Sequence, residues 1–249
     1  MDKTSTNHPV SQAGMAGPIP GTPKIGTLNE KPLHDALKRC YARPGDRFEV
    51  PVDGFVVDIV RGDLLIEVQT RNFSAIKRKL ERLLIDHPVR LIYPIPRVKW
   101  ITKRKLADGG DGPASRRRSP KHGGFEHVFE ELIRLPGLLG HPNFSIELLL
   151  IEEEEVRRFD GARGWRRRGW VTDERRLLRV VDGRVFYTPA DMRAFIPAAL
   201  AEPFSVTDLA TATDISRTLA RKMVYCLRAM GCVAPAGKRA NAILYARRG

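Results

Sequence analysis

An aspartate, a glutamate and a glutamine are spaced so that one β-hairpin would bring them together. If Gly62 and Asp63 form the two-residue turn of this hairpin, Asp58 falls directly opposite Glu67, with Cβ atoms about 5 Å apart. Gln69 shares their face, because side chains alternate along a strand with a period of two. Three polar side chains therefore converge on one face of a hairpin whose second strand is apolar on its other face.

Two carboxylates that face each other across a hairpin repel, so a partner should offset the repulsion. A divalent cation such as Mg²⁺ (or Mn²⁺) takes oxygen ligands from such carboxylates, activates water and stabilises charge on a scissile phosphate. The alternative is that Asp58 and Glu67 lie on an exposed face and only make it soluble. Val56 and Leu65 flank the acids on the same face, which favours the metal site.

The spacing of apolar residues predicts the elements that must hold this hairpin. Apolar residues three and four apart indicate helices, and segments rich in Val, Ile and Phe indicate strands. The predicted order is a helix over 29–41, strands over 48–60 and 64–70, a helix from 72 to about 87, a strand over 89–101, a helix over 125–135 and a strand over 144–156.

At these residues the chain resembles the PD-(D/E)XK, or restriction-endonuclease-like, nuclease superfamily. The core of that superfamily has the same order of helix, hairpin, helix and strand. Asp58 matches the first acid of the family motif and Glu67 the second, while Gln69 occupies the position of the motif lysine. The resemblance implies a catalytic metal site at the two acids, with Glu30 as a further acidic ligand. The alternative for Glu30 is an ordinary first-turn glutamate favoured by the helix dipole.

Gln69 is the point at which the chain departs from the motif. The motif lysine is thought to orient or activate the attacking water, and an amide cannot accept or release a proton as an amine does. The missing charge could come from Lys77 or Lys79 on the following helix, or from Arg71. Catalysis is thus a weaker inference than metal binding.

The charge of the chain narrows its class of partner. Its 43 Lys and Arg residues against 29 Asp and Glu residues give a formal net charge of +14, which predicts a polyanionic partner. No apolar run reaches the roughly 18 residues of a membrane-spanning helix, so DNA is expected and a membrane is not. Residues 1–24 are predicted to be a disordered tail, and three scattered cysteines predict reduced thiols in a cytoplasmic protein.

Two basic segments are candidates for contact with nucleic acid. Residues 103–124 are predicted to be a loop, either a solvated linker or a phosphate-binding loop. Residues 159–188 are predicted to be a connecting segment whose arginines lie along a nucleic-acid backbone while its tryptophans stack on bases; the alternative is that the tryptophans cap the core. The candidate contacts are Arg116, Arg117 and Arg118 in the first segment and Arg166, Arg167 and Arg168 in the second.

Residues 189–249 change to short helices rich in small residues, predicted over 190–200, 206–212 and 215–230, followed by a hairpin with a basic tip. Three helices and a basic hairpin resemble a winged helix-turn-helix domain, in which the third helix enters the major groove and the wing reaches the backbone. The alternative is a domain that contacts only proteins. The resemblance implies DNA contacts by Arg217, Thr218, Arg221 and Lys222 on the third helix and by Lys238 and Arg239 on the wing.

Together these observations predict an α/β protein. A restriction-endonuclease-like mixed sheet flanked by helices is expected over 25–158, followed by the winged helix domain. The predicted function is a Mg²⁺-dependent DNA endonuclease whose C-terminal domain docks the duplex. A catalytically inactive, nuclease-like DNA-binding regulator is the alternative, and an RNA-processing nuclease ranks third. A homodimer is left open, and a similarity to bacterial proteins of unassigned function adds no activity.

Overall fold

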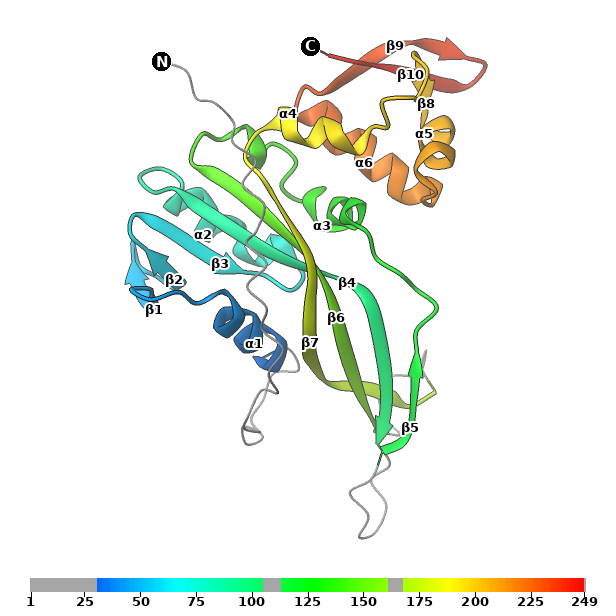
Figure 1. Ribbon diagram of the computed structural model, residues 1–249. Coiled ribbons are helices and arrows are strands. Elements are labelled where there is room, and N and C mark those ends of the chain that lie inside the picture. Colours follow the sequence, from blue (N-terminus) through cyan, green and yellow to red (C-terminus); the bar gives the residue numbers. More distant parts are fainter. Residues whose placement is uncertain (1–30, 105–112, 161–167, 249) are drawn as a thin grey trace.

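The computed structural model describes residues 31–104, 113–160 and 168–248 (Figure 1). The first part of the chain follows the predicted order of helix, hairpin, helix and strand. It comprises α1 (Lys31–Tyr41), β1 (Arg47–Val52), β2 (Phe55–Arg61), β3 (Leu64–Val68), η1 (Phe73–Ile76), α2 (Lys77–Leu83) and β4 (Val89–Arg104). The next part comprises β5 (Pro113–Arg118), η2 (Phe125–Val128), α3 (Phe129–Leu132), η3 (Leu138–Gly140), β6 (Phe144–Phe159) and β7 (Trp170–Phe186).

A single mixed sheet organises these elements. Its strand order is β1-β2-β3-β4-β6-β7, and β5 pairs with β4 outside this path. β1, β2 and β3 form an antiparallel meander, β4 is parallel to both β3 and β6, and β7 is antiparallel to β6. The chain is therefore an α/β protein with a mixed sheet and helices, as the sequence predicts.

The hairpin register predicted from the turn is confirmed next to the turn. Arg61 pairs with Leu64, Val60 with Leu65 and Ile59 with Ile66, and the pairing of β2 with β3 ends there, one position before Asp58 and Glu67. Gly62 has a φ of +57°, which glycine adopts without the penalty that a Cβ would bring. The turn thus fixes which side chains of β2 and β3 share a face.

Three predicted segments are wrong in detail. The strand expected over 48–60 is two strands, because Asp53 and Gly54 both adopt positive φ and form a turn. The loop expected over 103–124 contains β5, which pairs with the end of β4. The connecting segment expected over 159–188 contains β7, whose Arg176 and Arg179 lie opposite glutamates of β6. Charged strands of this kind are stabilised by partners far away in the sequence, which local composition does not reveal.

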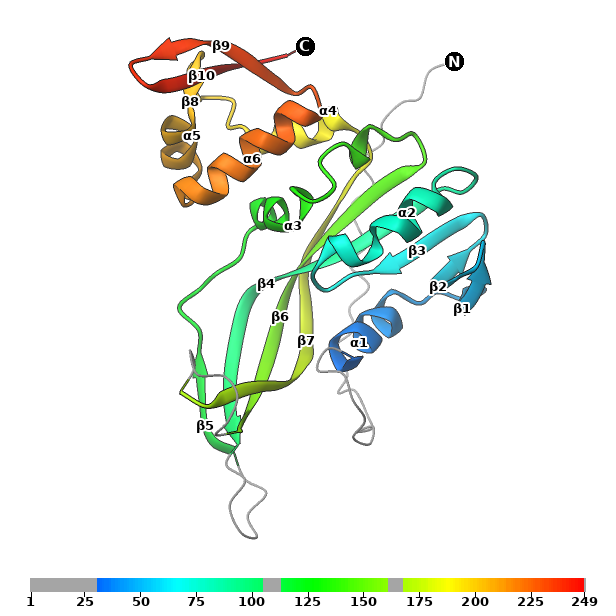
Figure 2. The same ribbon diagram turned by 180° about the vertical axis from the view of Figure 1, so that it is seen from behind.

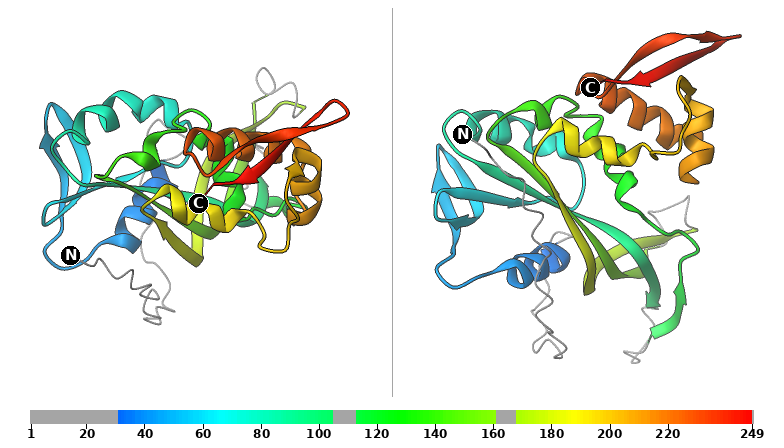
Figure 3. Two further views of the ribbon diagram at one scale, coloured as in Figure 1. Left: turned by 90° about the horizontal axis from the view of Figure 1, so that it is seen from above. Right: turned by 45° about the horizontal axis from the view of Figure 1, so that its top comes forward.

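The helices pack on both faces of the sheet. Leu33 and Leu37 of α1 pack against Ile59 and Ile66 of the hairpin. On the opposite face, α2 and α3 belong to a larger cluster that includes Leu80 and residues of β4 and β6. Seen from above, α1 and α2 lie on opposite sides of the sheet (Figure 3). The hairpin is therefore held between two helices.

The C-terminal unit packs onto α3 (Figure 2). It comprises α4 (Pro189–Met192), η5 (Arg193–Phe195), β8 (Phe204–Ser205), α5 (Val206–Thr213), α6 (Arg217–Ala229), β9 (Val233–Arg239) and β10 (Ala242–Arg247). Met223 and Leu227 of α6 share a buried cluster with Phe129 and Leu132 of α3. The helix predicted over 190–200 is shorter, because Pro197 disfavours a helical conformation at the residue before it.

Between β3 and β5 no strand pairs with this edge of β4, where Gly123 N donates to Pro96 O over 2.9 Å. Gln69 N donates to Ile92 O at the end of β3, and Ser119 N donates to Lys99 O beyond the end of β5. Pro94 and Pro96 share the parity of Ile92, so they lie along the edge between these two bonds. Proline has no N–H to donate and is tolerated in a strand at such an unpaired edge.

Beyond this edge the sheet continues as an arm, formed by residues 97–104, 113–118, 152–159 and 170–179, which reaches away from the C-terminal unit (Figure 1). The arm buries ion pairs. Glu153 is fully buried, with Lys99 Nζ at 2.8 Å and Arg175 Nη2 at 2.5 Å. Glu155 lies beside them and pairs with Arg157 at 2.7 Å. Burial favours the neutral acid, but Arg157 and Lys99 outweigh it and hold the pKa of Glu155 at about 2.

Removal of the buried carboxylate should destabilise the fold. Glu153→Ala removes the fully buried carboxylate that pairs with Arg175 and Lys99, and breaking a buried ion pair costs about 3–5 kcal/mol of the free energy of unfolding. Glu152→Ala is the matched control, because its partner Arg179 is exposed and solvent screens the pair. Urea denaturation should show a large decrease for the first variant and little change for the second. Equal, small decreases in both would contradict the role of the buried layer.

Candidate functional site

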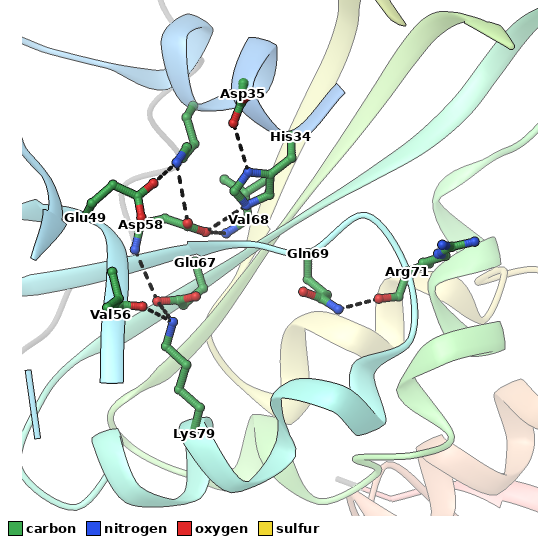
Figure 4. A network of polar contacts seen from close by, with 11 residues as sticks. His34, Asp35, Glu49, Val56, Asp58, Glu67, Val68, Gln69, Arg71 and Lys79 are labelled. Atoms are coloured by element: carbon green, nitrogen blue, oxygen red, sulfur yellow. Dashed lines mark hydrogen bonds and ion pairs between the residues drawn. The ribbon is translucent and has the colours of Figure 1, made fainter. Parts of the chain in front are cut away.

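The acids of the hairpin are joined by hydrogen bonds across β2 and β3 (Figure 4). Asp58 N donates to Glu67 Oε1 over 3.4 Å, and Val68 N donates to Asp58 Oδ2 over 2.9 Å. Glu67 is only 4% exposed. Asp58 contacts α1 and Glu67 contacts α2, which lie on opposite sides of the sheet, so the expectation that the two carboxylates share one face is wrong. Each carboxylate is largely buried, where an uncompensated negative charge is costly.

Helix α1 supplies two side chains to Asp58. His34 Nε2 lies 3.1 Å from Asp58 Oδ2, and Lys38 Nζ lies 3.7 Å from Asp58 Oδ1. Burial acts to raise the pKa of Asp58, but the hydrogen bond and charge of His34, the Val68 N–H and Lys38 together lower it. Asp58 is therefore held as a carboxylate.

Sequence reasoning missed His34 and Lys38. They stand four residues apart, each directly after a core leucine of the same helix. Residues with this spacing share one helix face, so the pair borders the buried face of α1. A His and a Lys at this border could have indicated that α1 supplies partners to the predicted acidic hairpin.

Helix α2 supplies a lysine to Glu67. Lys79 Nζ lies 2.5 Å from Glu67 Oε1 and donates to Val56 O over 2.6 Å. Lys77, the other lysine considered from the sequence, pairs instead with Glu81 on the outer side of the helix. The structure thus brings Lys79, and not Lys77, to the acids.

Glu67 is the acid of this site whose pKa is shifted to near neutral. Burial raises its pKa to about 7, Lys79 acts in the opposite direction, and the charge of Asp58 adds to the rise. Because this pKa lies above its ordinary value, the contribution of Glu67 to stability is complete below about pH 4.5 and is lost as the pH rises through about 7. A cation that bound beside Asp58 and Glu67 would lower the pKa of Glu67 again.

Gln69 follows Glu67 but contacts its own loop. Its amide nitrogen donates to the carbonyl oxygen of Arg71 and, over 3.2 Å, to that of Asn72. Asn72 adopts a left-handed conformation, which these bonds support. Gln69 therefore helps to hold the turn between β3 and α2, the helix that carries Lys79.

The described residues form no closed metal cage around the two acids. Within 31–104, 113–160 and 168–248, no group of three or more His, Cys, Asp or Glu side chains is arranged to hold a metal ion. Glu30, the further ligand expected from the sequence, lies outside the described residues. Mg²⁺ is commonly held by one or two carboxylates completed by water and substrate phosphates. Asp58 and Glu67 each carry the carboxylate oxygens that such a site uses, one toward α1 and one toward α2.

Four of the basic residues predicted on the two central segments lie in the described part of the arm. Arg116 pairs with Glu154 over 2.9 Å and lies over the ring of Trp100. Arg117, Arg118 and Arg168 are exposed, while Arg166, Arg167 and Trp165 lie outside the described residues. The ring of Trp170 packs against Phe159 and under Lys103.

Basic residues also line the exposed side of the C-terminal unit. Arg217, Thr218, Arg221 and Lys238 are exposed, and Lys222 is half-buried. Arg239 pairs with Asp208 over 2.6 Å. Two further exposed residues of α6, Tyr225 and Arg228, were not singled out from the sequence.

A protein-family model covers the mixed sheet of this chain. The model described as "Domain of unknown function (DUF8091)" matches residues 31–187. The chain belongs to this family. The family segment begins with α1 and ends directly after β7, so it holds the whole mixed sheet and both acids.

A related protein extends the similarity beyond that segment. A protein described as "Uncharacterized protein", from Treponema pallidum (strain Nichols), is 32% identical over 223 residues, which cover 89% of this chain and 86% of that protein. These residues are more than the family segment contains. No solved structure matches the chain. No helix in the described part of the chain is long and apolar enough to cross a membrane.

The pairing of Lys79 with Glu67 can be tested in solution. Lys79→Met removes the positive charge that opposes burial, so the pKa of Glu67 should rise above its value of about 7. Lys77→Met, the matched control, removes a charge that faces Glu81 and should leave that pKa unchanged. The ¹³C shift of the Glu67 carboxyl carbon, followed by NMR against pH, measures both. The same pKa in wild type and Lys79→Met would refute the pairing.

Proposed function

We propose that the protein is a metal-dependent DNA endonuclease with a restriction-endonuclease-like core. The observation that carries this proposal is the place of Lys79. The family motif requires an amine beside its two acids, and Gln69 does not provide one. Lys79 Nζ, 2.5 Å from Glu67 Oε1, supplies that amine from the next helix. The element order from α1 to β4 and the hairpin register support the same family.

Each residue of the site has a distinct proposed role. Asp58 and Glu67 would hold Mg²⁺ (or Mn²⁺) together with a phosphate of the substrate. When bound, the metal supplies an activated water and stabilises charge on the phosphate. Lys79 donates to Glu67 and would orient the attacking water. Gln69 holds the loop that joins the strand of Glu67 to the helix of Lys79.

The C-terminal unit is proposed to be a winged helix domain that docks duplex DNA. Its order of helix, short strand, two helices and hairpin supports this fold, and β8, β10 and β9 form one small sheet. The exposed side of α6 presents Arg217 and Arg221, and the hairpin presents Lys238 near its tip. Helices with such a surface read the major groove in known winged helix domains.

A second function is favoured by a specific observation. Asp58 already pairs with His34 and Lys38, and Glu67 with Lys79. The chain therefore compensates both carboxylates with its own cations, as a protein without a metal would need to do. We propose as the alternative that the domain binds DNA without cutting it and acts as a regulator.

Cleavage separates the two functions. Wild-type protein should nick or cut plasmid and short duplexes in Mg²⁺ or Mn²⁺, and Glu67→Ala should abolish cutting because it removes a ligand of the metal. Lys79→Met should lower the rate by roughly 100-fold or more, whereas Lys77→Met should leave it near the wild-type rate. If neither metal supports cutting that depends on Glu67, the enzyme proposal fails and the regulator remains.

DNA binding tests the C-terminal unit. The double variant Arg217→Gln/Arg221→Gln should weaken binding of duplex DNA at least about tenfold, because two cations no longer reach a phosphate or a base. Arg43→Gln/Arg47→Gln removes the same charge from exposed positions at the other end of the sheet and serves as control. Gel shifts in Ca²⁺, which blocks turnover in many Mg²⁺ nucleases, measure both. Equal affinities in the two variants would show that α6 is not the docking helix.

A further inference from the structure

The tip of the arm brings together two basic segments that are distant in the sequence. Arg118 of β5 pairs with Trp100 of β4, and Arg104 of β4 pairs with Arg158 of β6. The turn that contains Arg168 joins β6 to β7 at the same end of the sheet. Residues that the sequence places in two separate loops therefore reach the same arm of the sheet, with Arg104 and Arg118 on one face and Arg117 on the other.

Cations of the arm divide into two sets. Lys99, Arg157 and Arg175 neutralise the buried glutamates and are needed for the fold. In contrast, Arg104, Arg117, Arg118 and Arg168 form no ion pair with any residue in the described ranges. The second set leaves an excess of positive charge at the tip.

The aromatic rings of the arm hold cations rather than offer free faces. Arg116 lies 4.3 Å from the centre of the Trp100 ring, and Lys103 lies 4.6 Å from that of Trp170. Phe159 packs on Trp170 as well. These contacts fix positive groups at the tip and disfavour stacking on bases, so the surface suits phosphates, which guanidinium groups bind through paired hydrogen bonds.

The acids and the arm lie along one strand. Glu67 pairs with Leu91 of β4, and Arg117 pairs with Ile101 of the same strand. Ten residues of straight strand span about 33 Å, and the irregularity between Pro96 and Val98 makes the separation shorter. The acids and the arm therefore lie within about one turn of B-DNA, which is roughly 34–36 Å. A duplex that contacts both would present phosphates to the arm within one turn of the acids.

We propose that the tip of the arm binds the phosphate backbone of duplex DNA without regard to sequence, as a contact separate from α6. The partner is the duplex DNA of the proposed function. The inference rests on the proposed DNA binding and does not depend on cleavage. The arm would hold the duplex on one side of the acids while the C-terminal unit holds it at the opposite end of the molecule.

Neutralisation of the tip tests this proposal in the full chain. Arg104→Gln/Arg117→Gln/Arg118→Gln should weaken binding of a duplex of about 40 base pairs at least tenfold at roughly 0.1 M salt. The slope of log K against log salt should become shallower by about 0.9 for each phosphate that the variant no longer neutralises, so by roughly 2–3. Two duplexes of unrelated sequence should show the same fold decrease in affinity.

Arg39→Gln/Arg43→Gln/Arg47→Gln is the matched control, since it removes the same charge from exposed positions beside α1 and β1. Thermal unfolding of both variants excludes unfolding as the cause of weaker binding. Equal weakening by both variants, an unchanged salt slope, or a decrease confined to one sequence would overturn the arm contact. If wild-type protein binds no duplex but binds anionic lipid vesicles through these arginines, the DNA proposal falls with it. Wild-type binding without any effect of the tip variant would remove the arm contact alone.

Discussion

Burial of two adjacent carboxylates is the constraint on which the centre of this molecule depends. Asp58 faces α1 and Glu67 faces α2 on the two sides of the hairpin, and Glu67 Oε1 accepts the backbone N–H of Asp58. An uncompensated carboxylate in such a largely buried place is costly. The helices on the two sides of the sheet therefore have a second task besides covering apolar surface: α1 brings His34, and α2 brings Lys79.

This constraint also explains why the two acids behave differently. Asp58 receives a backbone N–H and a histidine, and its pKa is lowered despite burial. Glu67 receives one lysine and faces the charge of Asp58, and its pKa is raised to about 7. One acid is thus firmly ionised, and the other changes protonation near neutral pH. Neighbouring acids whose pKa values are driven apart in this way are a common property of sites that move protons.

The sequence predicted the local part of this arrangement and missed the part that depends on distant pairing. The register next to the turn follows from a two-residue loop and the period of a strand, so it could be predicted. The shared face expected for Asp58 and Glu67 was wrong, because the pairing ends at Ile59 and Ile66 and the two acids turn to different helices. Lys79 could be proposed but not separated from Lys77, because their difference is a rotation about a helix whose orientation depends on packing. β5 and β7 were missed because Arg116 of β5 and the arginines Arg175, Arg176 and Arg179 of β7 pair with glutamates of β6. His34 was missed because its partner lies 24 residues away.

The cations that make the acids stable in the protein alone also set the conditions under which a metal could bind. A dication at Asp58 and Glu67 has to share these carboxylates with Lys79 and His34, so the two carboxylates alone would bind it weakly. A phosphate group would add negative charge and oxygen ligands at the same point. Its negative charge would offset the positive charge of Lys79 and His34. Metal and phosphate would then bind cooperatively, because each supplies the charge that the other lacks. In the proposed nuclease, Lys79 of α2 would supply the amine beside the acids, while the amide of Gln69 holds the connecting loop in place.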